Sequence, residues 1–133
     1  MDISREELRA LGFRPAGTVH PAAGMCRVEI DRDTQGLAVY AMVVGTEVKK
    51  FGTTGRKNSN FRSRMLSTFS ALRQTIIKGT PYLGDPFKRY APAAILANKE
   101  VELWTKESTE AIFETEESQL NNKYRPEWTK EGH

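Results

Sequence analysis

The sequence is poor in the residues that disulfide-bonded, zinc-binding and membrane-spanning proteins require. Cys26 is the only cysteine, which excludes internal disulfides and thiolate zinc clusters and suits a reducing cytoplasm. Neither histidine, His20 or His133, has a helical partner at the spacing of a metal site. No apolar run approaches the roughly 20 residues that span a bilayer, and the first residues carry acids where a signal peptide is basic. We therefore expect a cytoplasmic protein without a membrane partner.

Acidic residues are nearly missing from the middle of the chain. Residues 49–90 contain ten basic residues and one acid, Asp85, which gives this stretch a net charge of +9. Residues 100–119 show the reverse, with seven glutamates against Lys106 and a net charge of −6. A concentrated basic block is typical of a surface that binds phosphates. The alternative is a solvated face whose charges balance the acidic segment across the fold.

The pattern of apolar residues predicts one α+β domain over residues 1–133, a small antiparallel sheet flanked by helices. A capping box at Ser4 and Glu7 begins a short helix that Gly12 ends. A loop rich in Gly, Pro and Ala should follow over 15–24. Further strands are expected at 26–30, 37–44, 47–51 and 101–106, and helices at 61–78, 93–98 and 111–124, the last one capped by Ser108 or Thr109. Residues 1–35 should thus add a helix and an extra strand to a core over 36–128.

Glu117 lies in the middle of an apolar helical stripe. Phe113, Glu117, Leu120 and Tyr124 recur three or four residues apart, so they share one face of the helix. Burying an unpaired carboxylate is costly, and Glu117 therefore needs a cation, a metal or a proton as its partner. The less specific interpretation is that Glu117 pairs with a structural arginine or leans to the rim of the helix face.

Four segments, in order and on the expected elements, resemble the GIY-YIG nuclease superfamily. Ala38-Val39-Tyr40 is similar to the first signature tripeptide, and Lys50-Phe51-Gly52 to the second. Arg64 stands where the family's helix carries its arginine, and Glu117 stands where a later helix carries its glutamate. The resemblance extends over residues 36–128 and implies a GIY-YIG-like catalytic core.

The resemblance implies an endonuclease that hydrolyses DNA phosphodiester bonds. Tyr40 would deprotonate the attacking water, while Lys50 and Arg64 would lower the pKa of its phenol. Arg64 would also hold the scissile phosphate, and Glu117 would be the one protein ligand of Mg²⁺ or Mn²⁺. Because a catalyst with one site must act twice to cut both strands, a homodimer or a specificity subunit is an expected partner besides DNA. The candidate DNA contacts in the basic block are Arg56, Lys57, Arg62, Lys88 and Arg89.

The chain also departs from the family pattern. Lys50 replaces the second signature tyrosine, and Thr68 and Thr129 stand where a histidine and an asparagine are frequent. The segment between Gly52 and Arg64 is longer than usual. These departures leave an alternative open, a non-catalytic nucleic-acid-binding or protein-interaction module on a degenerate GIY-YIG scaffold. A third alternative is a structural or assembly protein that leaves the basic block unused.

The candidate residues also have structural interpretations. Tyr40 would be a core tyrosine, Lys50 an edge charge and Arg64 a surface helix residue. The register of the hairpin distinguishes these interpretations. A three-residue loop places Tyr40 opposite Lys50, whereas a two-residue loop places Tyr40 opposite Phe51 and turns Lys50 away. The proposed chemistry requires the first register.

Overall fold

The computed structural model describes residues 4–22, 25–31, 37–54, 60–78, 90–91, 94–95, 97, 99–109 and 111–128. Half of the expected helix at 93–98 and the candidate DNA contacts Arg56, Lys57, Lys88 and Arg89 lie outside these residues. The named elements, in chain order, are α1 (Arg5–Ala10), β1 (Arg14–Ala22), β2 (Met25–Ile30), β3 (Ala38–Val44), β4 (Glu47–Thr54), α2 (Phe61–Lys78), β5 (Val101–Glu107) and α4 (Phe113–Tyr124).

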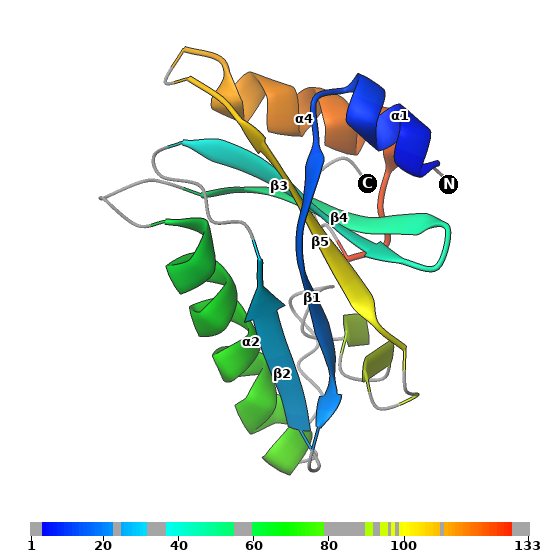
Figure 1. Ribbon diagram of the computed structural model, residues 1–133, viewed down its shortest axis with the longest axis vertical. Coiled ribbons are helices and arrows are strands. Elements are labelled where there is room, and N and C mark those ends of the chain that lie inside the picture. Colours follow the sequence, from blue (N-terminus) through cyan, green and yellow to red (C-terminus); the bar gives the residue numbers. More distant parts are fainter. Residues whose placement is uncertain are drawn as a thin grey trace.

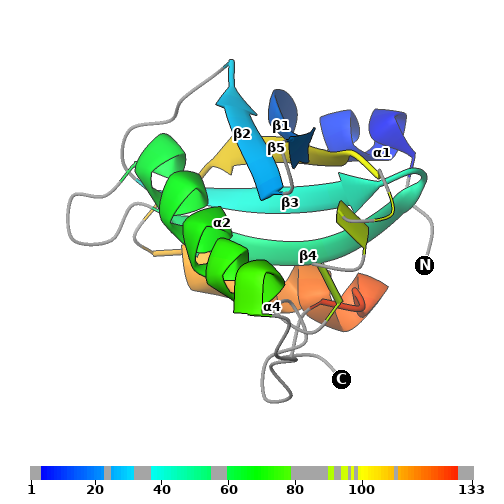
Figure 2. The same cartoon turned by 90° about the horizontal axis from the view of Figure 1, so that it is seen from below.

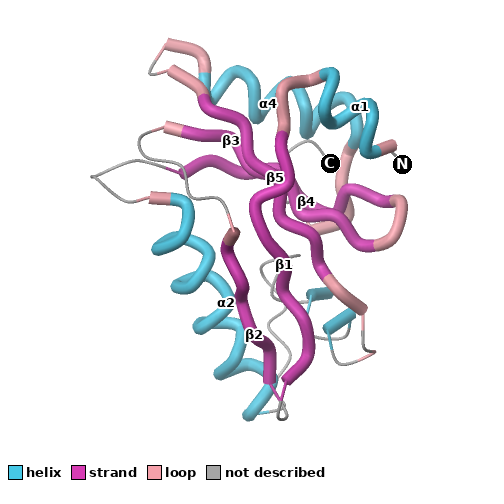
Figure 3. The backbone as a smooth tube through the Cα atoms, in the orientation of Figure 1, coloured by secondary structure: helices cyan, strands magenta, loops and turns pink. Residues whose placement is uncertain are grey.

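The strands form one antiparallel sheet in the order β2-β1-β5-β3-β4 (Figure 1 and Figure 3). The predicted α+β class is confirmed. β3 lies between β5 and β4, and all but its last residue are buried, as its continuous apolar run predicts. β4 is an edge strand of the sheet. No helix in the described part of the chain is long and apolar enough to cross a membrane.

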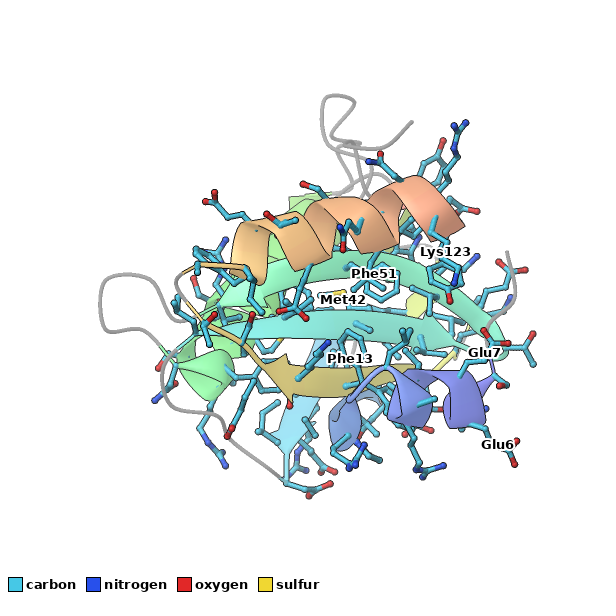
Figure 4. All side chains as sticks on the ribbon, turned by 90° about the horizontal axis from the view of Figure 1, so that it is seen from above. Glu6, Glu7, Phe13, Met42, Phe51 and Lys123 are labelled. Carbon is cyan, nitrogen blue, oxygen red and sulfur yellow. The ribbon has the colours of Figure 1, made fainter. Side chains whose placement is uncertain are left out.

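Helices cover both faces of the sheet. α1 and α4 pack on one face, and α2 packs on the other (Figure 1 and Figure 2). Phe13 and Phe51 lie in the layer between the sheet and the first pair of helices (Figure 4), and their ring centroids are 5.9 Å apart. The core on the α2 face is a separate cluster that includes Tyr40, Met42, Phe61, Met65, Phe69, Leu103 and Trp128. The molecule therefore has two apolar layers with the sheet between them.

Two helix boundaries follow from local capping. The hydroxyl of Ser4 accepts a hydrogen bond from the backbone N–H of Glu7 at 3.0 Å, which confirms the predicted start of α1. At the start of α2, the side chain of Asn60 accepts from the N–H of Ser63 at 2.8 Å. These caps satisfy backbone donors that a helix cannot pair internally.

The prediction of a loop over 15–24 is wrong for residues 15–22, which belong to β1. This strand pairs with β2 on one side and with β5 on the other, so tertiary pairing overrides its Gly, Pro and Ala composition. Gly17 permits the close approach of β2, because a Cβ at this position would collide with the backbone carbonyl of Glu29. The segment before β3 therefore contributes two strands to the sheet instead of one.

Candidate active site

A bulge in β4 sets the face on which Lys50 lies. Val44 pairs with Glu47 across a two-residue turn, but the register shifts after Val43, so that Met42 pairs with Lys50. The bulge inserts Lys49 and returns the following residues to the faces that a three-residue loop would have given them. Neither predicted register is correct, because Tyr40 pairs with Gly52 and not with Lys50 or Phe51. The shared face of Tyr40 and Lys50, which the proposed chemistry requires, is nevertheless present.

Tyr40 pairs with Gly52, the last residue of the second signature-like tripeptide. A Cβ built on Gly52 would collide with the ring and the hydroxyl of Tyr40, so the tyrosine lies flat across the glycine backbone. The residue is 4% exposed, and its ring centroid is 6.4 Å from that of Phe61 at the start of α2. Because β4 is the edge strand, the phenol lies over the border strand of the sheet at Gly52.

Buried polar residues surround Tyr40 on this face. Thr105 of β5 pairs with Tyr40 on the side opposite Gly52 and is 3% exposed. Thr54, two residues after Gly52, is also 3% exposed, and its hydroxyl has no hydrogen-bond partner among the described residues. The sequence analysis missed both threonines. They could have been found in the sequence as hydroxyl residues at positions that alternation assigns to the buried face of their strands.

Arg62 and Arg64 lie on opposite flanks of the buried face of α2. The guanidinium of Arg62 donates to the backbone carbonyl of Ile30 at 3.0 Å, which links the start of α2 to β2. Residues of a helix are separated by about 100°, so Arg64 points away from the flank that contacts β2. Arg64 is exposed, and it lies in the same helical turn as Phe61, which contacts Tyr40.

Glu117 lies on α4, the helix on the other face of the sheet. Phe113 and Tyr124 are buried as the helical stripe predicts, and Leu120 packs against the same core. Glu117 itself is half-buried, so it leans to the rim of the stripe instead of lying in the core. The polar residue in the core is Asn121, one turn later, whose amide atoms lack hydrogen-bond partners within the described residues.

The first turn of α4 is attached to β5 by Glu116. One carboxylate oxygen of Glu116 is 2.6 Å from Nζ of Lys106, and the other accepts a hydrogen bond from the hydroxyl of Ser108. Burial raises the pKa of Glu116, but these two hydrogen bonds and the lysine charge outweigh it and leave the pKa below its ordinary value. The prediction that Ser108 or Thr109 caps α4 is wrong. The N-cap residue is Ile112, which makes no side-chain capping bond.

The segment after α4 passes round the edge strand to the other face. Arg125 adopts a left-handed conformation with φ of 45°, and Trp128 then enters the core on the α2 face. The N–H of Trp128 donates to the carbonyl of the bulge residue Lys49 at 2.8 Å, while the Lys49 ammonium is 2.7 Å from Glu47 and 3.6 Å from Glu127. Burial lowers the pKa of Lys49, yet the bond to Glu47 and the charge of Glu127 hold it above its ordinary value.

The described residues offer few ligands for a metal ion. Nowhere in the described part of the chain do three His, Cys, Asp or Glu side chains gather as a metal site. Glu117 is accessible, whereas both oxygens of Glu116 are engaged by Lys106 and Ser108. A site with one protein carboxylate suits Mg²⁺ or Mn²⁺, which keep several waters and take substrate oxygens as further ligands. The same donor set does not suit zinc, which needs three or four protein ligands.

The four candidate residues thus come from elements on both sides of β4. Tyr40 and Lys50 share the α2 face, and Arg64 lies on the exposed surface of the helix packed there. Glu117 is on α4, which packs on β3 and β4 from the opposite side (Figure 4). α2 packs on β2 and also meets β3 through the contact of Phe61 with Tyr40. We take the edge of β4 near Gly52, over which the Tyr40 ring lies, as the candidate active site.

The chain was compared with known proteins. No protein-family model and no curated protein matches the sequence. Among the solved structures that match the fold are two endonucleases. A glutamate-to-alanine mutant of bacteriophage T4 EndoII has a TM-score of 0.67 and 15% identity, and the match covers 94% of this chain and 97% of that one. The restriction endonuclease Hpy188I, in complex with product DNA, has a TM-score of 0.55 and 16% identity, and the match covers 81% of this chain and 62% of that one. The chain therefore shares the fold of these two endonucleases.

Proposed function

We propose that this protein is a metal-dependent endonuclease that hydrolyses phosphodiester bonds of DNA. The observation that carries the proposal is the position of the Tyr40 phenol, which crosses the edge strand at Gly52 and is bordered by buried polar residues. Gly52 leaves room for the phenol at the edge of the sheet, and the hydroxyl residues beside it make this part of the buried layer polar. The likeness to two endonucleases, one of them bound to product DNA, supports the same chemistry.

Tyr40 acts as the general base in this proposal. Hydrolysis needs a deprotonated water, a cation on the phosphate and stabilisation of the leaving oxygen. An ordinary phenol has a pKa near 10 and is a weak base at neutral pH, so nearby cations must favour the phenolate. Lys50, two residues before Gly52 on the same face, supplies this positive charge, and Arg64 holds the scissile phosphate through its guanidinium.

Glu117 holds the divalent cation in this proposal. When bound, the cation stabilises the negative charge that develops on the phosphate and the leaving oxygen. Glu117 orients its carboxylate from the rim of α4, where water and a phosphate oxygen have access. Asn121, one turn further along the same helix face, is a second polar group with unused hydrogen-bonding capacity in the described structure.

The substrate is DNA, and its backbone is held by basic residues of the 49–90 segment. Arg56, Lys57, Arg62, Lys88 and Arg89 are the proposed phosphate contacts. Arg62 also bonds to β2, so its contribution combines structure and charge. A second copy of the chain or a specificity subunit would allow both strands of a duplex to be cut.

A plasmid-nicking assay with Mg²⁺ or Mn²⁺ tests the proposal. Glu117→Gln should abolish nicking, because the amide keeps the shape of the side chain and removes the charge. Tyr40→Phe should slow nicking by about 10²–10⁴-fold, the usual contribution of a general base. Glu114→Gln is the matched control, since Glu114 is an exposed glutamate of the same helix and should keep wild-type activity.

Folding and DNA affinity must be measured on the same variants. Both active-site variants should melt and bind DNA like the wild type, because each changes only one polar group. A wild-type protein that binds DNA in a salt-dependent manner, yet nicks it with neither metal, would contradict the proposal and identify a non-catalytic module.

A further inference from the structure

A cavity of about 310 Å³ lies at the turn end of the β3–β4 hairpin. It is lined by Val44 and Lys49 of the hairpin, by residues of the segment before β5, and by the two residues that end the described chain. Val44 packs against the same core as Tyr40, and four residues of a strand span about 13 Å. The cavity is therefore separate from the candidate active site, yet close enough for one DNA molecule to reach both.

The apolar residues of the cavity are two aromatic rings and two alanines. Trp128 lines it from the core at 1% exposure, and Tyr90 lines it at 38% exposure. Ala94 and Ala97, with one methyl group each, line the cavity without filling it. Ligand pockets start at about 300 Å³, so the occupant is small. A single nucleobase is flat and of this size, and proteins hold unpaired bases by stacking them on aromatic side chains.

The charged residues of the cavity suit a nucleotide better than a purely apolar ligand. Lys99 is exposed and can contact a phosphate. Nζ of Lys49 is 3.6 Å from the Glu127 carboxylate, so the charge of Glu127 is offset while its oxygens can still accept hydrogen bonds. The Watson–Crick edge of every base carries at least one N–H donor for such an acceptor.

The concave shape selects an unpaired base. In a duplex the bases are stacked on one another, so a cavity in a protein receives a base only after the base has left the stack. Single strands and mismatched sites offer such bases at the lowest cost. In the sequence, Tyr90 directly follows Lys88 and Arg89, two of the proposed phosphate contacts, so it belongs to the segment expected to meet the DNA backbone.

We propose that this cavity is a subsite for one unpaired base of the DNA, an inference that takes its substrate class from the proposed function. The base stacks against Tyr90, its polar edge meets Glu127, and its phosphate lies at Lys99. The subsite gives the protein a preference for DNA with a single-stranded or mismatched segment near the cleaved bond.

The experiment compares affinities for a short single-stranded oligonucleotide and for a duplex of the same length, without divalent metal. Tyr90→Ala should weaken single-strand binding about tenfold, because it removes the stacking surface. Tyr90→Phe keeps the ring and should retain most of the affinity. Neither variant should change the slope of log affinity against log salt, because neither removes a charge.

A second variant and a control keep the test independent of folding. Ala97→Leu adds volume at an exposed position of the cavity, so it should weaken single-strand binding without disturbing the core. Ile112→Ala removes a side chain that is 47% exposed at the start of α4, on the other face of the sheet. This control should bind both forms of DNA like the wild type.

The outcomes separate the inference from the proposed function. If the wild type nicks DNA, and Tyr90→Ala and Ala97→Leu bind the single strand like the wild type, the inference is wrong and the proposed function stands. Equal losses for the duplex, or free deoxycytidine monophosphate that binds as tightly as the oligonucleotide, would also overturn the inference. If the wild type does not nick DNA, while both variants lose single-strand affinity, the catalytic proposal fails and the subsite belongs to a non-catalytic DNA-binding module.

Discussion

The two faces of the sheet hold their helices by different means. On the α2 face, the first turn of the helix is held by close apolar packing. Phe61 contacts the ring of Tyr40, and this ring lies on Gly52. On the other face, α1 and α4 are attached to β5 by ion pairs, Arg5 with Glu102 and Lys106 with Glu116. Close packing thus places the candidate base, whereas on the face of the candidate metal ligand ion pairs add to the apolar contacts of Phe113 and Tyr124. Added volume should damage the first, and lost charge should damage the second.

Gly52→Ala tests the face that depends on shape and should have the largest effect. A methyl group at this position collides with the Tyr40 ring, so the phenol must move. Misplacement of a reacting group by about 1 Å can cost about 100-fold in rate. The added volume in a packed layer should also destabilise the fold by about 1–3 kcal/mol.

Nicking rates and urea unfolding of Gly52→Ala give both quantities. Thr53→Ala is the control, because Thr53 is the next residue and its side chain points to the opposite face. Wild-type nicking by Gly52→Ala would show that the position of the Tyr40 phenol does not matter for activity. It would thereby remove the observation that carries the proposed function.

Lys50→Met tests whether charge also matters on the α2 face. The methionine keeps most of the packing volume and removes the ammonium, so the Tyr40 pKa should rise. A rise of one unit would slow nicking roughly tenfold near neutral pH and leave the rate at high pH intact. The pH–rate curve should therefore move to higher pH. Lys49→Met is the control, because its ammonium is engaged by Glu47 and Glu127 and its curve should stay in place.

Arg62→Ala and Arg64→Ala should have smaller effects, and they should differ in the stability of the fold. Arg62→Ala removes the bond to Ile30 and should lower the free energy of unfolding by about 1 kcal/mol. Arg64→Ala should change that free energy by less than about 0.5 kcal/mol, because Arg64 is exposed. Both variants should reduce the slope of log affinity against log salt by about one, because each removes a proposed phosphate contact. A larger loss of stability in Arg64→Ala than in Arg62→Ala would contradict the structural role of Arg62.

The elements could largely be predicted from the sequence, but their pairing could not. Local signals were sufficient for α1, α2 and β3, because capping residues and apolar periodicity act within a few residues. β1 was mistaken for a loop, since its partners β2 and β5 are distant in the sequence and its composition alone resembles a turn. The bulge at Lys49 could not be predicted either. The carbonyl of Lys49 accepts a hydrogen bond from the backbone N–H of Trp128, about eighty residues further along the chain.

The candidate site shows the same division. Tyr40, Lys50, Arg64 and Glu117 could be selected by their resemblance to a family, and the fold expected from that resemblance is confirmed. Three further polar residues could not be selected in this way, Thr54, Thr105 and Asn121. They are notable because they are polar and buried, and their burial follows only from tertiary packing. The ion pair of Glu116 with Lys106 was not predicted either, because in the sequence Glu116 is one of seven glutamates of the acidic segment 100–119.

The central claim is that groups from both faces of the sheet act together at the edge of β4. Its most direct test is the crystal structure of Tyr40→Phe with uncleaved duplex DNA and Mn²⁺, in which anomalous scattering locates the metal. The account predicts one Mn²⁺ bound by the Glu117 carboxylate and by a phosphate that Arg64 also contacts, next to the substituted ring at Gly52. Mn²⁺ bound by Glu116, or a phosphate remote from Gly52 and Arg64, would contradict the claim.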